Sequence, residues 1–184
     1  MEQFEMRKNM WSMAGVEGLK LGLVSAAYLF ASILLEKSGM PLLLTTILAF
    51  VLWAAKFAGC ILLMRYAMLK FAASESGISN KDSFRFGMAT ALLSALVFSA
   101  ISFANVAFLS ADMYSEQINN ALQQMAPMMD SNSLSMVDRY MEKLPQITFF
   151  SNLIYCFLFG TVLSSILSKN IPSTDPFADY KPQE

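Results

Sequence analysis

The sequence contains no histidine, and this absence excludes the commonest catalytic arrangements. Without an imidazole there is neither a Ser-His-Asp triad nor a Cys-His pair to activate a nucleophile. No cluster of cysteine and carboxylate residues has the spacing of a metal site, and no glycine-rich phosphate loop follows a strand. We therefore expect a protein that is not an enzyme and that holds neither a metal nor another cofactor.

Cysteine and charge are also scarce. The two cysteines, Cys60 and Cys156, lie in apolar stretches, where small packed side chains are expected rather than a disulfide. Charged residues make up 15% of the chain and hydrophobic residues 55%, against about 25% and about 45–50% in soluble domains. The net charge of −1 gives no reason to expect a nucleic-acid partner. This composition is typical of a small membrane protein, with the lipid bilayer as its surroundings.

Four apolar segments are long enough to cross a bilayer. The clearest is 41–64, because a hydrocarbon core of about 30 Å needs about 20 apolar residues in a helix. We expect an all-α, polytopic membrane protein whose four transmembrane helices form an up-down bundle. Residues 1–170 would make this single domain. The four predicted spans are 12–35, 41–64, 84–111 and 147–167. We expect the helix of the second span to continue past the membrane to about Ala73.

The segment 112–146, between the third and fourth spans, is predicted to form two short amphipathic helices. They are too short to cross a membrane, so we expect a cap over the bundle or helices in the interface. Methionines here could bind copper(I), but their helical spacing favours adaptable packing, including packing against a partner protein. The apolar residues that carry this prediction are Ile118, Leu122, Met125, Met129, Tyr140 and Met141.

Lysine and arginine are divided unequally between the two ends of the predicted spans. The positive-inside rule then places both termini in the cytoplasm of a bacterium, with the protein in the inner membrane. The tail, 171–184, contains three prolines and is expected to be flexible. The cations on the cytoplasmic side are Arg7, Lys8, Arg65, Lys70, Lys81, Arg85, Lys169 and Lys181, and those on the outer side are Lys37, Arg139 and Lys143.

Small residues recur at every fourth position in all four spans; in the second they are Ala55 with Gly59 and Ala54 with Ala58. In lipid this pattern lets helix backbones approach closely, so it predicts tight packing between helices. The small residues are Gly18, Gly22 and Ala26 in the first span, Gly87, Ala91, Ala95 and Ser99 in the third, and Gly160 and Ser164 in the fourth.

Glu17, Lys20 and Lys56 are the ionisable residues that we place inside the membrane, where charge is costly and often functional. Counting about 1.5 Å per residue from the span ends predicts a similar depth for all three, in the cytoplasmic half. One interpretation is a site for an anionic headgroup or an ion. The favoured interpretation is a structural ion pair of Glu17 with Lys20 or Lys56, with lysine side chains reaching the inner interface.

Several features together resemble a known family. They are the glycines of the first span (Gly15, Gly18 and Gly22), the short turn before the second span, the FRFGM motif at 84–88, and the helical segment before the fourth span. Over most of residues 10–170 the sequence resembles the domain-of-unknown-function family numbered 4199, small four-span membrane proteins of Bacteroidota. The resemblance transfers no catalytic residue. It implies an accessory role beside a membrane glycosyltransferase that acts on a lipid carrier.

Two functions are compatible with these observations. The preferred one is a non-enzymatic accessory or scaffold protein that binds another membrane protein or associates with itself. The small-residue patterns, the methionine-rich external segment and the absence of catalytic groups support it. The alternative is a small carrier or flippase-like protein for an anionic lipid or solute, which would use Glu17, Lys20 and Lys56. A membrane enzyme is the least supported possibility.

Overall fold

The computed structural model describes residues 2–74, 78–125 and 131–171, and within these ranges helices are joined by short turns. Four helical segments are long and apolar enough to cross a membrane: Lys8–Lys37, Leu42–Ser74, Asn80–Leu109 and Leu144–Ser168. This confirms the predicted fold class, an all-α polytopic membrane protein. The helix of the second span continues past residue 64 to Ser74, as the sequence predicted.

Helices α1 (Glu2–Lys37) and α2 (Leu42–Ser74) form an antiparallel hairpin. The turn between them needs Gly39, whose φ of +66° lies in the left-handed region that glycine adopts without strain. The carbonyl of Leu35 at the end of α1 accepts hydrogen bonds from the Ser38 hydroxyl at 2.6 Å and from the Ser38 backbone N–H at 3.2 Å. This short turn holds the ends of the two helices together.

Helix α3 (Asn80–Ala104) begins with a capping box. The Ser79 hydroxyl accepts a hydrogen bond from the Asp82 backbone N–H at 3.2 Å, and the Asp82 carboxylate accepts one from the Ser79 N–H at 3.4 Å. At its far end α3 passes into a π-helical turn, η1 (Asn105–Leu109), closed by the Ser110 N–H on the Asn105 carbonyl at 2.8 Å. Such turns often occur at functional sites.

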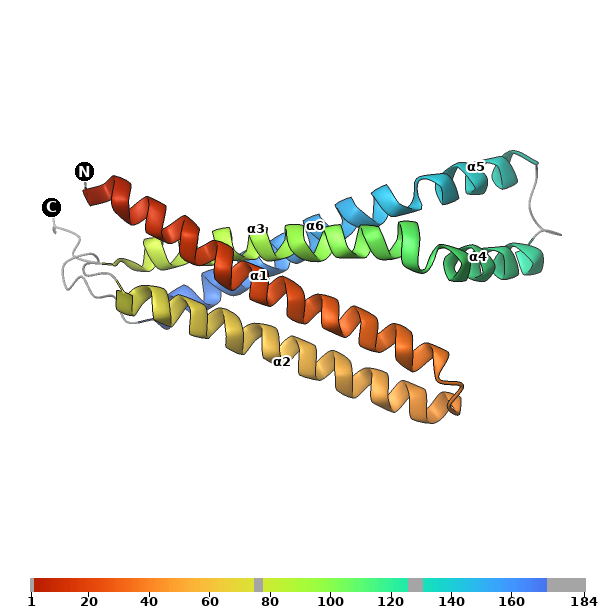
Figure 1. Cartoon of the computed structure of the whole chain (residues 1–184), viewed down its shortest axis with the longest axis horizontal. Coiled ribbons are helices and arrows are strands. Elements are labelled where there is room, and N and C mark those ends of the chain that lie inside the picture. The colour runs from red at the N-terminus through yellow and green to blue at the C-terminus, as the bar shows by residue number, and fades with distance from the viewer. Residues whose placement is uncertain (1, 75–77, 126–130, 172–184) are drawn as a thin grey trace, which may run out of the picture.

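Helix α6 (Leu144–Ser168) is the fourth spanning helix, and α3 is the central one. Helix α3 packs against α6 and α1, and also contacts α2, whereas α2 and α6 meet only over a short stretch. The bundle is therefore open between α2 and α6. In Figure 1 the α1–α2 hairpin and the α3–α6 pair diverge toward the end farthest from the termini.

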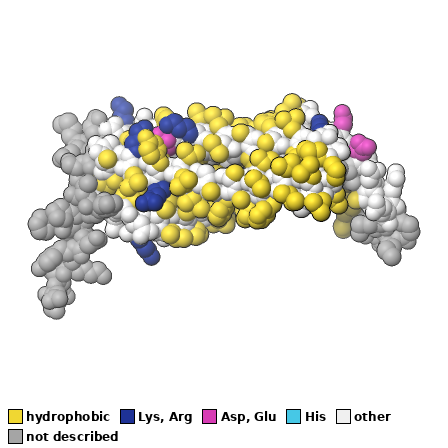
Figure 2. Space-filling model, turned by 90° about the horizontal axis from the view of Figure 1, so that it is seen from below, with side chains coloured by type: hydrophobic (Ala, Val, Ile, Leu, Met, Phe, Trp, Pro, Cys, Tyr) yellow, Lys and Arg dark blue, Asp and Glu magenta, His cyan; other side chains and the backbone are white. Residues whose placement is uncertain are grey.

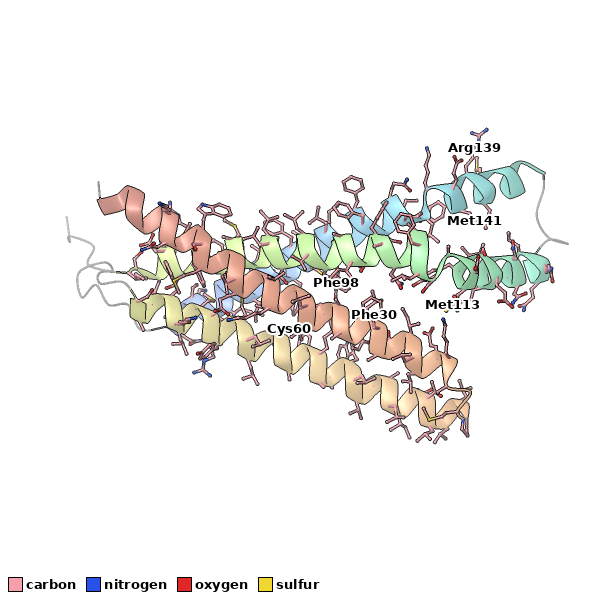
Figure 3. All side chains as sticks on the ribbon, in the orientation of Figure 1. Phe30, Cys60, Phe98, Met113, Arg139 and Met141 are labelled. Carbon is pink, nitrogen blue, oxygen red and sulfur yellow. The ribbon has the colours of Figure 1, made fainter. Side chains whose placement is uncertain are left out.

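Helices α4 (Ala111–Met125) and α5 (Ser131–Glu142) continue beyond α3 and α6 (Figure 1). They do not extend over the α1–α2 hairpin, so the predicted cap covers only half of the bundle. Figure 3 shows Met141 on the side of α5 toward α4, with Arg139 pointing away. Of the residues predicted to pack there, Ile118, Leu122 and Met141 are partly buried, Tyr140 is 57% exposed, Met125 ends α4, and Met129 lies outside the described residues.

The hydrophobic core lies at the end of the bundle near the termini. The rings of Phe71 in α2 and Phe86 in α3 stack with centroids 4.3 Å apart, and both are fully buried. Ile78 and Ile171 are buried in the same cluster. Ile171 is therefore part of the core, although we predicted it to begin the flexible tail; residues 172–184 lie outside the described residues.

Charged side chains are distributed unevenly along the molecule. Figure 2 shows hydrophobic side chains over most of the length of one face, with lysine and arginine gathered at the end near the termini. This is the pattern of a lipid-facing surface with one cationic border.

Candidate functional site

A buried carboxylate lies at the cationic end of the bundle. The side chain of Glu17 in α1 is only 5% exposed, and its Oε1 atom is 2.9 Å from Lys20 Nζ and 3.2 Å from Lys70 Nζ of α2. Both lysine side chains are about half exposed, at 52% and 49%. The cluster ties α1 to α2, with its cations at the surface. It has the form of a structural ion-pair network, and sequence reasoning missed Lys70 as a member.

Lys56 does not belong to this cluster. Its ammonium group lies over the Tyr28 ring, 4.8 Å from the centroid, and over the Phe98 ring at 5.1 Å. Tyr28 follows Glu17 by eleven residues in α1, which is about 16 Å along the helix. The prediction that Glu17, Lys20 and Lys56 share one depth is therefore wrong for Lys56. The reason is the register of the α1–α2 hairpin, in which Lys70 rather than Lys56 is level with Glu17.

Lys56 lies near the middle of α2. Fourteen residues separate it from Leu42 and fourteen from Lys70, about 21 Å in each direction. Nine residues, about 13 Å, separate it from Arg65, the first cation after the apolar run. Half of a hydrocarbon core is about 15 Å, so Lys56 lies close to its middle. Its four-carbon stem is too short to carry the charge to either interface.

Lys56 lines a pocket of about 130 Å³ that all four spanning helices contribute to. The rings of Phe57 and Phe159, 5.4 Å apart, form a contact between α2 and α6 beside it. Trp53 of α2 and Tyr155 of α6 also line the pocket and are 51% and 70% exposed, so they form its rim. The pocket thus opens sideways, between α2 and α6, toward the lipid. Figure 3 shows Cys60, which also lines it, near the middle of the molecule.

The charge of Lys56 is only partly compensated. Among the described residues no carboxylate pairs with it, and its three N–H donors have no hydrogen-bond acceptor. A cation–π contact contributes about 0.5–1 kcal/mol, or about 2 when desolvated. A lysine at the centre of a membrane helix costs at least about 2.5–3.5 kcal/mol. The Tyr28 and Phe98 rings therefore offset part of this cost and leave the hydrogen-bonding groups unsatisfied.

The glycines of α1 allow close approach to α3. A Cβ atom added to Gly18 would lie 2.9 Å from Leu93 Cβ, and one added to Gly22 would lie 2.7 Å from Val97 Cβ. Ala26 continues this row and is 4% exposed. The predicted small-residue row of the first span thus lies at the contact of α1 with α3.

The small residues of α3 and α6 face each other. A Cβ atom on Gly87 would lie 2.7 Å from Ser164 Oγ, and one on Gly160 would lie 2.5 Å from Ala91 Cβ. Ala95, one turn further along α3, is completely buried. These residues let α3 and α6 approach closely, and Ala91 and Gly160 also line the Lys56 pocket.

A second cluster of buried polar side chains lies toward the outer end of α3. The hydroxyls of Ser99 and Ser102 and the Nδ2 atom of Asn105 are buried without a hydrogen-bond partner in the part of the chain that the structure describes. Asn105 Oδ1 accepts a hydrogen bond from Ser110 Oγ at 3.1 Å. Sequence reasoning assigned only helix packing to Ser99; the three-residue spacing of these polar side chains in an apolar span was the available signal.

The side chains that converge at the pocket are of limited chemical variety. Across residues 2–74, 78–125 and 131–171, no three His, Cys, Asp or Glu side chains converge in a way that could hold a metal ion. The pocket offers one ammonium group, two thiols (Cys60 and Cys156), hydroxyls and aromatic faces. This set can bind an anion.

Residues 17–169 match the family model described as protein of unknown function DUF4199. The chain belongs to this family. No curated protein and no solved structure matches it significantly. The matched region of this DUF4199 protein includes both the Glu17 cluster and the Lys56 pocket, so both lie within the family domain.

Proposed function

We propose that this DUF4199 protein is a non-enzymatic accessory or scaffold subunit that binds another membrane protein within the bilayer. The observation that supports it is Lys56, a cation near the middle of α2 whose pocket opens sideways between α2 and α6. A soluble partner cannot reach this depth, whereas a transmembrane partner can. The family resemblance suggests a membrane glycosyltransferase acting on a lipid carrier as the kind of partner.

A carrier or flippase-like function for an anionic lipid or solute is the second candidate. It is favoured by cations at two depths, Lys20 and Lys70 near the inner end and Lys56 in the middle. However, the pocket has a volume of about 130 Å³, below the roughly 300–1,000 Å³ of ordinary ligand sites. The size of the pocket therefore favours a single inserted side chain over a whole transported molecule.

We place both termini in the cytoplasm and the protein in a bacterial inner membrane. The gathering of lysine and arginine at the end of the molecule near the termini (Figure 2) supports this orientation. Helices α4 and α5 would then lie outside, next to the external part of a partner.

Cross-linking in native membranes tests the accessory function. A photoreactive amino acid at Tyr155, on the pocket rim, should form a discrete adduct with another protein. The same amino acid at Leu23, an exposed position of α1 away from α6, should form no such adduct. A Tyr155 adduct with lipid alone would favour the carrier function. If neither position traps a protein, the accessory function is wrong.

A further inference from the structure

We propose that the Lys56 pocket receives an Asp or Glu side chain that a transmembrane helix of a different protein carries at mid-membrane depth. This inference rests on the proposed accessory function and specifies the chemistry of its central contact. It predicts an ion pair between two proteins in the interior of the bilayer.

Charge is the first argument for a carboxylate. The Lys56 ammonium contacts the Tyr28 and Phe98 rings, and no described carboxylate or hydrogen-bond acceptor meets it. A carboxylate offers two oxygen atoms with about four lone-pair positions, and its hydrogen bonds to an ammonium group are charge-assisted. A neutral side chain could accept a hydrogen bond, but it would leave the positive charge uncompensated in the membrane.

Volume is the second argument. The pocket has about 130 Å³, and an apolar cavity of about 150 Å³ holds a benzene molecule. An Asp or Glu side chain has fewer non-hydrogen atoms than benzene, so it fits this space. A lipid headgroup with its glycerol unit is larger and does not.

Depth separates a transmembrane helix from a lipid as the source of the anion. Lys56 is nine residues, about 13 Å, from Arg65, so the anion must lie near the middle of the hydrocarbon core. The charged group of a resident lipid stays in the headgroup layer, about 15 Å from the middle. A helix side chain, in contrast, is fixed at its depth by the span that carries it.

The carboxylate does not come from a second copy of this chain. Within the predicted spans Glu17 is the only Asp or Glu. It is already held by Lys20 and Lys70, about 16 Å along α1 from the level of Tyr28 and Lys56. A second copy inserted with the same orientation would carry its Glu17 at that same wrong level. The partner is therefore a different protein.

The surface beside the pocket is suited to an approaching helix. Gly59 follows Lys56 by one turn of α2, and no atom lies within 4 Å of the position that a Cβ atom would occupy there. The backbone of α2 is thus open to close helix–helix contact next to Lys56. The exposed rings of Trp53 and Tyr155 can pack on either side of the inserted side chain.

The test uses synthetic transmembrane peptides and the full chain in phosphatidylcholine vesicles. The probe is a leucine–alanine helix with one glutamate at its centre, and energy transfer to a dye on the protein measures binding. Two matched peptides carry glutamine at the centre, or glutamate about seven residues from it, which is about 10 Å. The central glutamate peptide should bind at least tenfold more tightly than either.

Variants of the protein assign this preference to Lys56. Lys56→Met should reduce binding of the central glutamate peptide to the level of the glutamine peptide, and Lys56→Arg should retain the preference. Lys20→Met, which removes an exposed cation at another level, should bind like the wild type. Lys56→Glu with a central lysine in the peptide should restore binding, which shows that a Lys56 variant can fold.

Three outcomes would overturn the inference. They are equal binding of the glutamate and glutamine peptides, a preference that survives Lys56→Met, and displacement of the glutamate peptide by phosphatidate or oleate at a tenth of the lipid. The last outcome would assign the pocket to an anionic lipid. A Tyr155 adduct in native membranes without a glutamate preference would leave the accessory function standing and this inference wrong. A preference for the glutamate peptide without any Tyr155 adduct in native membranes would leave this inference standing and make the accessory function wrong.

Discussion

Gly160 of α6 lies so close to Ala91 of α3 that a Cβ atom added to the glycine would be 2.5 Å from the alanine Cβ. Side-chain Cβ atoms do not approach each other this closely, so the two helices could not keep their present distance with a larger residue. Because lipid supplies no hydrophobic force between helices, such packing is the main attraction between α3 and α6.

Gly160→Ala should therefore destabilise the protein by about 1–3 kcal/mol, the usual cost of overpacking. The control is Gly59→Ala in α2, where an added Cβ atom meets nothing within 4 Å. Both substitutions change the intrinsic helix preference by the same amount, so the difference in stability between the two variants reports the cost of packing alone. Unfolding of the purified variants in mild detergent measures both. Equal stabilities would contradict the proposed tight contact.

Composition and periodicity predicted the spans and the small-residue sides of the helices, because both depend on local sequence, but they did not predict that the third span packs against the fourth. Length and apolarity define a membrane helix, and small residues four apart define its close-packed side. The same reasoning misplaced Lys56, because its level relative to Glu17 depends on the register of the α1–α2 hairpin. Counting residues in both directions from the turn at Gly39 would have placed Lys56 better, because an antiparallel hairpin fixes which residues of α1 and α2 lie at the same level.

The outer end of the molecule was also poorly predictable. The amphipathic stripes indicated two helices in 112–146 but not which surface they would cover. Their position follows from the chain continuing out of α3 through η1 at Asn105, and no periodicity in the sequence encodes a π-helical turn. The side opening between α2 and α6 is likewise a property of the assembled bundle.

Removing the charge of Glu17 should loosen the inner end of the hairpin. Glu17→Gln should cost about 1–2 kcal/mol, because hydrogen bonds to charged groups contribute about 1.5–3 kcal/mol and both lysines are half exposed. Lys20→Met and Lys70→Met should each cost less, since one cation remains. The variant that carries both Lys20→Met and Lys70→Met should lose more free energy of unfolding than the two single variants together, because Glu17 would then be buried without a partner. Detergent unfolding tests this, with the exposed Glu116→Gln as control; additive lysine effects would contradict the shared ion pair.

The pKa of Tyr114 in α4 should report how near the end of α1 lies to the cap. Burial raises the pKa of Tyr114 above its usual value of about 10, and the negative charge of Glu36 raises this pKa further. The folded state therefore holds the phenol proton more tightly than the unfolded state. Stability should be independent of this group below about pH 10 and fall as the pH rises above it.

Titration of tyrosinate absorbance measures this pKa, as the difference between the wild type and Tyr114→Phe. Glu36→Gln should lower the pKa of Tyr114, because the neighbouring negative charge is removed. If Glu36→Gln leaves the titration unchanged, the end of α1 does not approach α4 in solution.

The proposed orientation predicts which positions a membrane-impermeant thiol reagent reaches. With Cys60 and Cys156 changed to alanine, Asn119→Cys in α4 should react in intact spheroplasts. Lys169→Cys, after α6, should react only once the membrane is opened. Labelling in the opposite order would mean that the protein has the inverted orientation in the membrane, and it would contradict cytoplasmic termini.

Lys56→Met should make the isolated protein more stable, by about 1–2 kcal/mol. The substitution keeps an apolar stem between Tyr28 and Phe98 and removes a charge that the two rings compensate only in part. Lys20→Met should not stabilise, because Lys20 pairs with Glu17. Unfolding of both variants in the same detergent makes the comparison. A stabilising Lys56→Met would mean that the charge is retained at the expense of stability, as expected for a group that meets its counter-charge only in a complex. A loss of stability would instead make Lys56 a structural cation that holds α1, α2 and α3 together.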